Sequence, residues 1–218
     1  MTAWAELALA FVLFMGAHAL PARPAVRQGL TRRLGTRAYL LLYSAVSLLL
    51  LGWLIAAAGR APYLPLWEPA AWQAHTALAA MAAACVLLSL AAGRPNPFSF
   101  GAGDPTRFDP HRPGIVGLTR HPLLLAVALW AGAHLLANGD LGHLLLFGAF
   151  LVMAVGGMAI LDRRNRRRLG PAWHEFAATR APTPLPGDAL RLLLAAILFA
   201  ALLILHPAVI GVDPLAWL

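Results

Sequence analysis

Six apolar segments, each roughly 20 residues long, constrain the fold of this chain more than any other feature, because about 20 helical residues cross a hydrocarbon core. Of the 218 residues, 60% are hydrophobic and 12% are charged, whereas soluble domains are about half apolar and a quarter charged. The sequence therefore predicts an all-α, polytopic membrane bundle in a single domain over 1–218. The predicted spans are Ala3–Leu20, Ala38–Ala58, Ala71–Ala92, Thr119–Ala137, Leu141–Leu161 and Ala189–His206.

The first apolar segment is predicted to be a retained helix. Ala17-His18-Ala19 resembles a signal-peptide cleavage site. A signal peptide begins with a basic region, however, and here the acidic Glu6 occupies that place.

The basic residues predict the orientation of the chain in the membrane. All seventeen are arginines, and the formal net charge is +8. Sixteen of the seventeen lie in the three connections on one face of the predicted bundle, and only Arg60 lies on the other. Because basic loops stay in the cytoplasm, that face is predicted to be cytoplasmic and both termini to lie outside a bacterial inner membrane. Topology accounts for the positive charge, so no nucleic-acid partner is expected.

Reporter fusions test this orientation. Fusions after residue 100 and after residue 175 are expected to be cytoplasmic, whereas fusions at both termini and near residue 64 are expected to be external. The measurement is the ratio of an enzyme active only outside the cytoplasm to one active only inside. A cytoplasmic C-terminus would contradict the arginine count.

Histidines are the candidate functional residues, because polar side chains inside a span are costly and usually have a role. His18 lies near the inner end of the first span, and His75 near the outer end of the third. His121 and His134 lie at the inner and outer ends of the fourth, roughly 20 Å apart along a helix. Axial ligation of haem is the recurring use of several such imidazoles, and hydrogen bonding to a neighbouring helix is the structural alternative. The structural role is predicted for His111, His143, His174 and His206.

Other metal sites are disfavoured. Glu68 and Asp140 are at span boundaries, so no carboxylate accompanies a histidine inside a span. The only cysteine, Cys85, lies in an apolar run, which excludes a disulfide scaffold and a thiolate zinc site.

Arg120-His121-Pro122 begins the fourth span. Proline fits the first turn of a helix, and a basic pair at a helix N-terminus attracts anions. The triplet is therefore either a helix start or an anion site for a haem propionate, a lipid phosphate or the carboxylate of a cofactor.

The other connections on the predicted cytoplasmic face are interpreted as membrane-surface elements. The segment from Arg94 to Pro113 is rich in proline and glycine, which predicts a loop lying on the membrane. The run Asp162–Arg168 predicts contact with anionic lipid. Leu169–Phe176 predicts a short amphipathic surface helix begun by Pro171.

Several motifs together resemble the NnrU family of bacterial membrane proteins. The resemblance covers nearly the whole chain, and the fourth-span motif is its specific part. The matching residues are Leu118-Thr119-Arg120-His121-Pro122, Leu129–Asp140, Gly16-Ala17-His18, Arg37–Ser47, Leu66-Trp67 and His75.

The resemblance implies a role in denitrification, where family members are linked to active nitrite and nitric oxide reductases. A relative of the family, 15-cis-zeta-carotene isomerase, is a haem b protein, which implies haem b here and a haem-dependent isomerisation as a further activity. It also implies His18 and His134 as the iron ligands. The predicted topology instead places His18 at the depth of His121 and His75 at the depth of His134, so the ligand pair stays open.

A more distant likeness is to isoprenylcysteine carboxyl methyltransferases, which share an Arg-His-Pro motif at a helix start. It implies an alternative in which Arg120, His121 and the arginines of 163–168 hold S-adenosylmethionine. The third alternative is a non-catalytic membrane assembly factor for the reductases.

Overall fold

The computed structural model describes residues 2–99, 103–174 and 181–216. Within these residues the regular elements are helices, and the only β pairs are two isolated bridges. The predicted all-α class is therefore confirmed. The chain forms two compact units, treated separately below: Met1–Leu66 with Asp140–Leu146, and Trp67–Gly139 with Phe147–Leu218.

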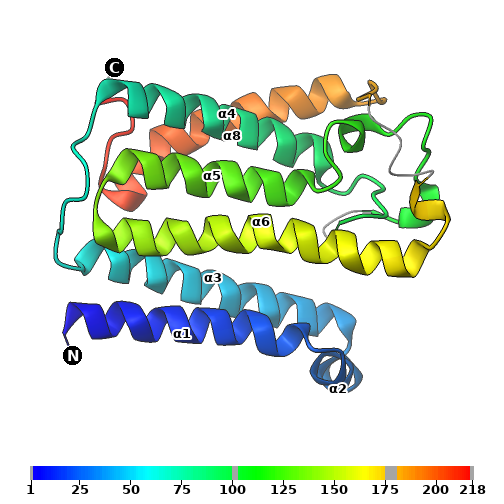
Figure 1. The fold of residues 1–218 in the computed structure, drawn as a ribbon, viewed down its shortest axis with the longest axis horizontal. Helices are drawn as coiled ribbons and strands as arrows, with labels where there is room; N and C mark the ends of the chain where they lie inside the picture. The colour runs from blue at the N-terminus through cyan, green and yellow to red at the C-terminus, as the bar shows by residue number, and fades with distance from the viewer. Residues whose placement is uncertain (1, 100–102, 175–180, 217–218) are drawn as a thin grey trace. The chain divides into compact units, whose positions relative to one another are not determined.

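The helices follow the predicted spans closely (Figure 1). Five helices are long and apolar enough to span a membrane. A further one, α5 (Pro122–Asn138), has 17 residues, which is the lower limit of lengths that cross a bilayer. The chain is therefore a multi-pass membrane protein, as predicted. The five helices long and apolar enough to span are α1 (Ala3–Ala22), α3 (Thr36–Arg60), α4 (Ala71–Ala91), α6 (Leu141–Leu169) and α8 (Asp188–Ile210).

Two helical stretches differ from the sequence prediction. The loop after the first span contains α2 (Pro24–Leu34), with proline in its first turn and Gly35 at φ +77° after its end. The end of α6 continues eight residues past the predicted Leu161, because arginine ends an apolar run without ending a helix. Of the predicted surface helix at Leu169–Phe176, the residues Glu175 and Phe176 lie outside the described residues.

In the first unit, α1 and α3 pack as an antiparallel pair. Glu6 near the start of α1 accepts a hydrogen bond from Trp53 Nε1 at 3.1 Å and forms an ion pair with Arg60. At the other end, Tyr39 donates to the carbonyl oxygen of Pro21. The single arginine predicted on the outer face is thus neutralised by the acidic residue of the first span.

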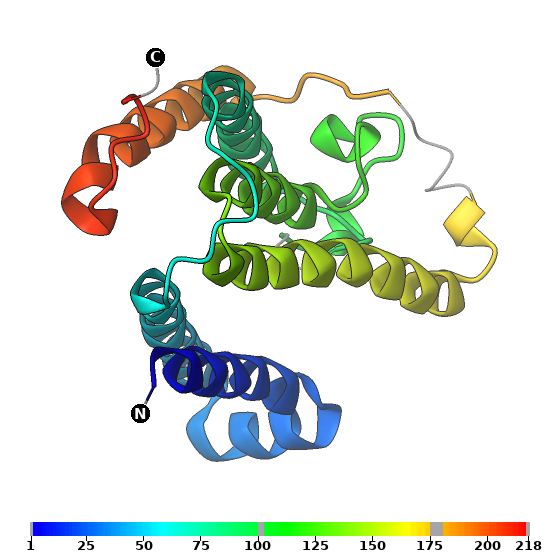
Figure 2. The ribbon, with the colours of Figure 1, turned by 60° about the vertical axis from the view of Figure 1, so that its left-hand side comes forward.

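In the second unit, α4 lies against α5 and α8 (Figures 1 and 2). Ala84 and Leu87 of α4 pack on Ala126 of α5, and α5 and α6 meet through Ala128 and Ala154. Small side chains allow close helix packing, which is the usual source of association inside a bilayer.

The connection between α4 and α5 lies at the same end of the second unit as the start of α8 (Figure 2). We term this end, which carries Arg94, Arg120 and Arg191, the arginine end. Arg191 of α8 donates to the carbonyl oxygens of Ser89 and Ala92 at the end of α4. Arg94 forms an ion pair of 2.7 Å with Asp188. The short 3-10 turn η2 (Gly114–Gly117) passes so close to the chain at Ala181 that a Cβ on Gly117 would lie 2.3 Å from a carbonyl oxygen.

At the opposite end of the second unit, Trp67 closes the C-terminus of α5. Its indole N–H donates to the carbonyl oxygen of Leu136 at 3.1 Å, and its backbone N–H donates to that of Gly139. Gly139 has φ +68°, and a Cβ there would lie 2.6 Å from the Trp67 carbonyl oxygen. Trp67, part of one of the NnrU-like motifs, thus caps a helix.

Candidate functional site

Two residues of the Arg120-His121-Pro122 triplet, Arg120 and His121, contact the same carboxylate. Pro122 is the first residue of α5 and His121 precedes it. Arg120 Nη2 donates to Asp162 Oδ2 of α6 at 2.6 Å, and His121 Nε2 lies 2.8 Å from Asp162 Oδ1. The side chains of His121, Asp162 and Arg120 are 4%, 17% and 38% exposed. A buried imidazole and a guanidinium therefore share one aspartate.

This pairing changes the interpretation of the predicted anion site. The anion that Arg120 and His121 face is the chain's own Asp162, so an external anion would have to displace it. The hydrogen bond to Asp162 raises the pKa of Arg120 above its ordinary value, which keeps the guanidinium charged. The Nδ1 atom of His121 is buried and has no hydrogen-bond partner among the described residues.

Two buried asparagines attach the neighbouring loop to this cluster. Asn96 Nδ2 donates to the carbonyl oxygen of Arg120 at 3.0 Å, and its Oδ1 accepts from the backbone N–H of Phe98. Asn165 of α6 donates to the carbonyl oxygen of Phe98. The loop predicted to lie on the membrane surface is therefore bound to the ends of α5 and α6.

Trp173 forms the other wall of the cluster. Its ring is buried and lies nearly perpendicular to that of Phe98, with 5.4 Å between centroids. The guanidinium carbons of Arg120 and Arg166 lie 5.5 and 5.4 Å from the centroid of its ring, a distance at which cation–π attraction operates. Sequence reasoning placed Trp173 on a surface helix and missed this role.

The intramembrane histidines share one local hydrogen bond. Nδ1 of His18, His75 and His134 lies 2.9, 2.7 and 2.8 Å from the carbonyl oxygen four residues earlier. Since a carbonyl oxygen can only accept, Nδ1 carries a proton, and in the neutral imidazole the lone pair then lies on Nε2. Metal-binding histidines use the same arrangement, which fixes the tautomer and directs Nε2 to the metal.

The surroundings of these three imidazoles differ. His18, in the first unit, packs on Phe14 and Tyr43, with centroid distances of 4.2 and 5.8 Å. His75 is exposed near the start of α4. Within the described ranges no three histidine, cysteine or acidic side chains are placed to hold a metal ion.

His134, in the second unit, lies in an aromatic setting. Its ring is 5.5 Å from Trp130 and 4.9 Å from Phe147 between centroids. His206 of α8 lies beside it at 6.3 Å, and its Nδ1 is 2.7 Å from the carbonyl oxygen of Val212. Two of the eight histidines thus meet at the end of the second unit opposite the arginine end.

A model of the NnrU protein family matches residues 6–214. The chain belongs to the NnrU family. The match includes both units and every candidate histidine, as the motifs around Arg120 and His134 predicted. Comparisons with curated proteins and with solved structures gave no match.

In this NnrU chain the candidate residues of the second unit, apart from the exposed His75, fall into two groups, while His18 lies in the first unit. Arg120 and His121 meet at the arginine end through Asp162. His134 lies near the other end of α5 and contacts His206, which the sequence analysis assigned a structural role only. The signal for His206 was its place near the outer end of the last span, the predicted depth of His134. His143, also predicted as structural, lies 2.6 Å from Asp140 at the start of α6.

Proposed function

We propose that this NnrU protein binds haem b in a bacterial inner membrane and supports the nitrite and nitric oxide reductases of denitrification. The observation that carries the proposal is the hydrogen bond from His134 Nδ1 to the Trp130 carbonyl oxygen. It assigns a proton to Nδ1, so that Nε2 is the nitrogen that would bind an iron. Family membership supports the link to denitrification.

His134 is the first proposed iron ligand. The second is His18, which the family resemblance implies and whose Nδ1 makes the same hydrogen bond within its helix. His206 is the alternative second ligand, because its ring lies next to that of His134 in the same unit.

A haem held by two histidines supplies one-electron chemistry. The chain's own residues would orient the imidazoles through their Nδ1–carbonyl hydrogen bonds and exclude water with aromatic rings. Trp130 serves both purposes, since its carbonyl oxygen accepts from His134 and its ring packs on Phe147 and Phe150. Haem-dependent isomerisation of an apolar substrate is the second proposed activity and would use the same ligands.

The contacts of Arg120 favour haem binding over methyl transfer. S-adenosylmethionine bound at Arg120 and His121 would present a carboxylate to them, and Asp162 already supplies one.

Haem content of single variants tests the proposal. The purified protein is expected to show a haem absorption band, with extraction giving haem b. His134→Ala is expected to lose most of the haem, because an apolar helix offers few replacement ligands. Haem per protein is measured for this variant, for His18→Ala, His75→Ala and His206→Ala, and for the matched control His111→Ala in an exposed loop.

The outcomes separate the ligand pairs. Loss of haem in His18→Ala and His134→Ala alone supports the pair implied by the resemblance. Loss of haem in His134→Ala and His206→Ala, with His18→Ala unaffected, supports the pair of His134 and His206. A colourless wild-type protein would contradict haem binding and favour the non-catalytic assembly role, whereas full haem in His134→Ala would exclude His134 as an iron ligand. Calorimetric binding of S-adenosylmethionine would favour methyl transfer instead.

A further inference from the structure

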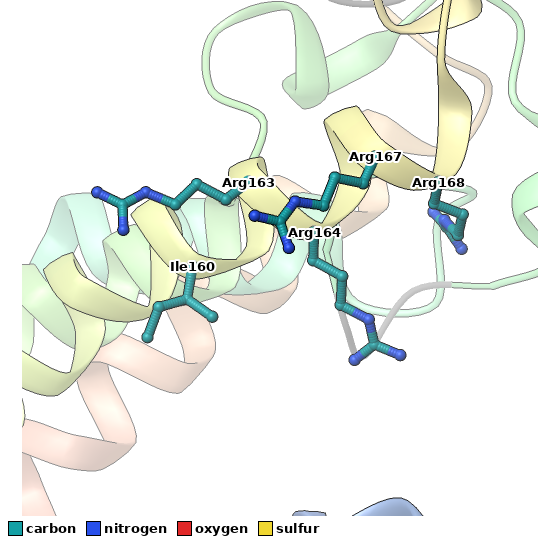
Figure 3. A pocket seen from close by; sticks show the side chains of 5 residues that line it. All are labelled: Ile160, Arg163, Arg164, Arg167 and Arg168. Atoms are coloured by element: carbon teal, nitrogen blue, oxygen red, sulfur yellow. The ribbon is translucent and has the colours of Figure 1, made fainter.

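One face of α6 near its end is lined by arginine side chains. Ile160, Arg163, Arg164, Arg167 and Arg168 border an open hollow of about 560 Å³ (Figure 3). Their spacing of three and four residues places them on one side of the helix, and all five are exposed.

The charge of this arginine face is not neutralised within the described residues. Arg163, Arg164 and Arg167 have no ion-pair partner there, and Arg168 donates to the carbonyl oxygen of Pro97. The adjacent Asp162 is engaged by Arg120 and His121 on another side of the helix. Four guanidinium groups therefore lie within two helical turns, where they repel one another unless an anion binds.

An exposed apolar strip leads directly to the arginine face. Val152, Val155 and Ile160 are exposed large hydrophobic residues on the preceding turns of α6. Val152, Ile160, Arg163 and Arg167 fall on the same side of the helix at 100° per residue. The surface therefore changes from apolar to cationic along one line, which matches the order of acyl chain and phosphate in a phospholipid.

We propose that this face of α6 binds an anionic phospholipid with two phosphates, of the cardiolipin type. The phosphates lie among Arg163, Arg164 and Arg167, and the acyl chains follow Ile160 and Val152. Guanidinium groups are suited to phosphate oxygens because of their planar donor geometry, and basic pockets at the cytoplasmic ends of membrane helices accept such headgroups. The apolar strip favours a lipid over a soluble phosphate, and the inference does not depend on haem binding.

Lipid titration of the delipidated full-length protein tests this proposal. Binding is measured by native mass spectrometry with cardiolipin, phosphatidylglycerol and phosphatidylcholine. Because each arginine near the membrane surface attracts an anionic lipid, cardiolipin is expected to bind at least about tenfold more tightly than phosphatidylcholine. The combined variant Arg163→Gln, Arg164→Gln and Arg167→Gln is expected to lose that preference.

The matched control removes the same charge elsewhere. Arg27→Gln, Arg32→Gln and Arg33→Gln change exposed arginines of α2, which also lie on the predicted cytoplasmic face, and should retain the wild-type preference. If the α6 triple variant does not fold, the single variant Arg167→Gln and the charge-retaining triple lysine variant replace it, with reduced and retained binding expected.

Three results would overturn the proposal. They are equal loss of binding in the α2 and α6 variants, equal binding of cardiolipin and phosphatidylcholine, and inorganic pyrophosphate binding as tightly as cardiolipin. The last result would identify a soluble anion as the ligand. Ile160→Asn separates the sources further, because it is expected to weaken cardiolipin and leave pyrophosphate unchanged.

Discussion

Asp162→Ala is expected to lower the free energy of unfolding by about 3 kcal/mol, because it leaves a buried imidazole and a guanidinium without their shared counter-charge. His121 is 4% exposed and Asp162 17% exposed in their side chains, so water compensates little of the loss. The measurement is thermal unfolding of the purified protein in detergent. Glu68→Ala, which removes an exposed acidic residue, is the matched control and should be nearly neutral.

A double-mutant cycle identifies the interaction itself. Arg120→Ala and Asp162→Ala are expected to be non-additive by about 1 kcal/mol or more, since contacting charges couple. Additive effects, or equal destabilisation by Glu68→Ala, would show that the aspartate acts only through local helix structure. Asp162→Asn keeps the size of the side chain and is expected to lie between wild type and Asp162→Ala.

Gly139→Ala is expected to destabilise the protein by about 3 kcal/mol. The alanine would occupy the left-handed region at a cost of about 1–2 kcal/mol, and its Cβ would lie 2.6 Å from the Trp67 carbonyl oxygen. Relief of that overlap moves Trp67 and breaks its hydrogen bond to Leu136, which costs about 1 kcal/mol more.

Gly132→Ala, in the same helix, is the control for this substitution. A Cβ at Gly132 meets no atom within 4 Å, and alanine is favoured over glycine in a helix by about 1 kcal/mol. The two variants are thus expected to move the unfolding temperature in opposite directions. Equal shifts would contradict the close approach of Trp67 to Gly139.

The spans of this protein could be predicted because length and hydropathy alone define a membrane helix. The residues at which the helices end were predicted less accurately. The five arginines within residues 163–168 close the apolar run of α6 but favour helix, so the helix continues to Leu169. α2 was missed because it is not apolar enough to span, although Pro24 and Gly35 are ordinary signals for its two ends.

Arg120 and His121 were singled out from the sequence as neighbours at a helix start, whereas the carboxylate that lies between them was not. Arg120 and Asp162 are 42 residues apart, and their contact depends on the register of α5 against α6. A signal did exist in the short turn at Gly139 and Asp140. An antiparallel helix pair centred there brings residues at similar distances from the turn, such as His121 and Asp162, to the same end.

The length of α6 has a consequence for what can reach the protein at its arginine end. Its 29 residues measure roughly 43 Å along the axis, about 13 Å more than the hydrocarbon thickness. For an untilted helix we expect the last turns, where Arg166 contacts Trp173, to lie in the headgroup layer and the water beyond it. A soluble protein could then contact the end of α6 without entering the bilayer. His134 lies at the other end of α5, roughly 20 Å from His121.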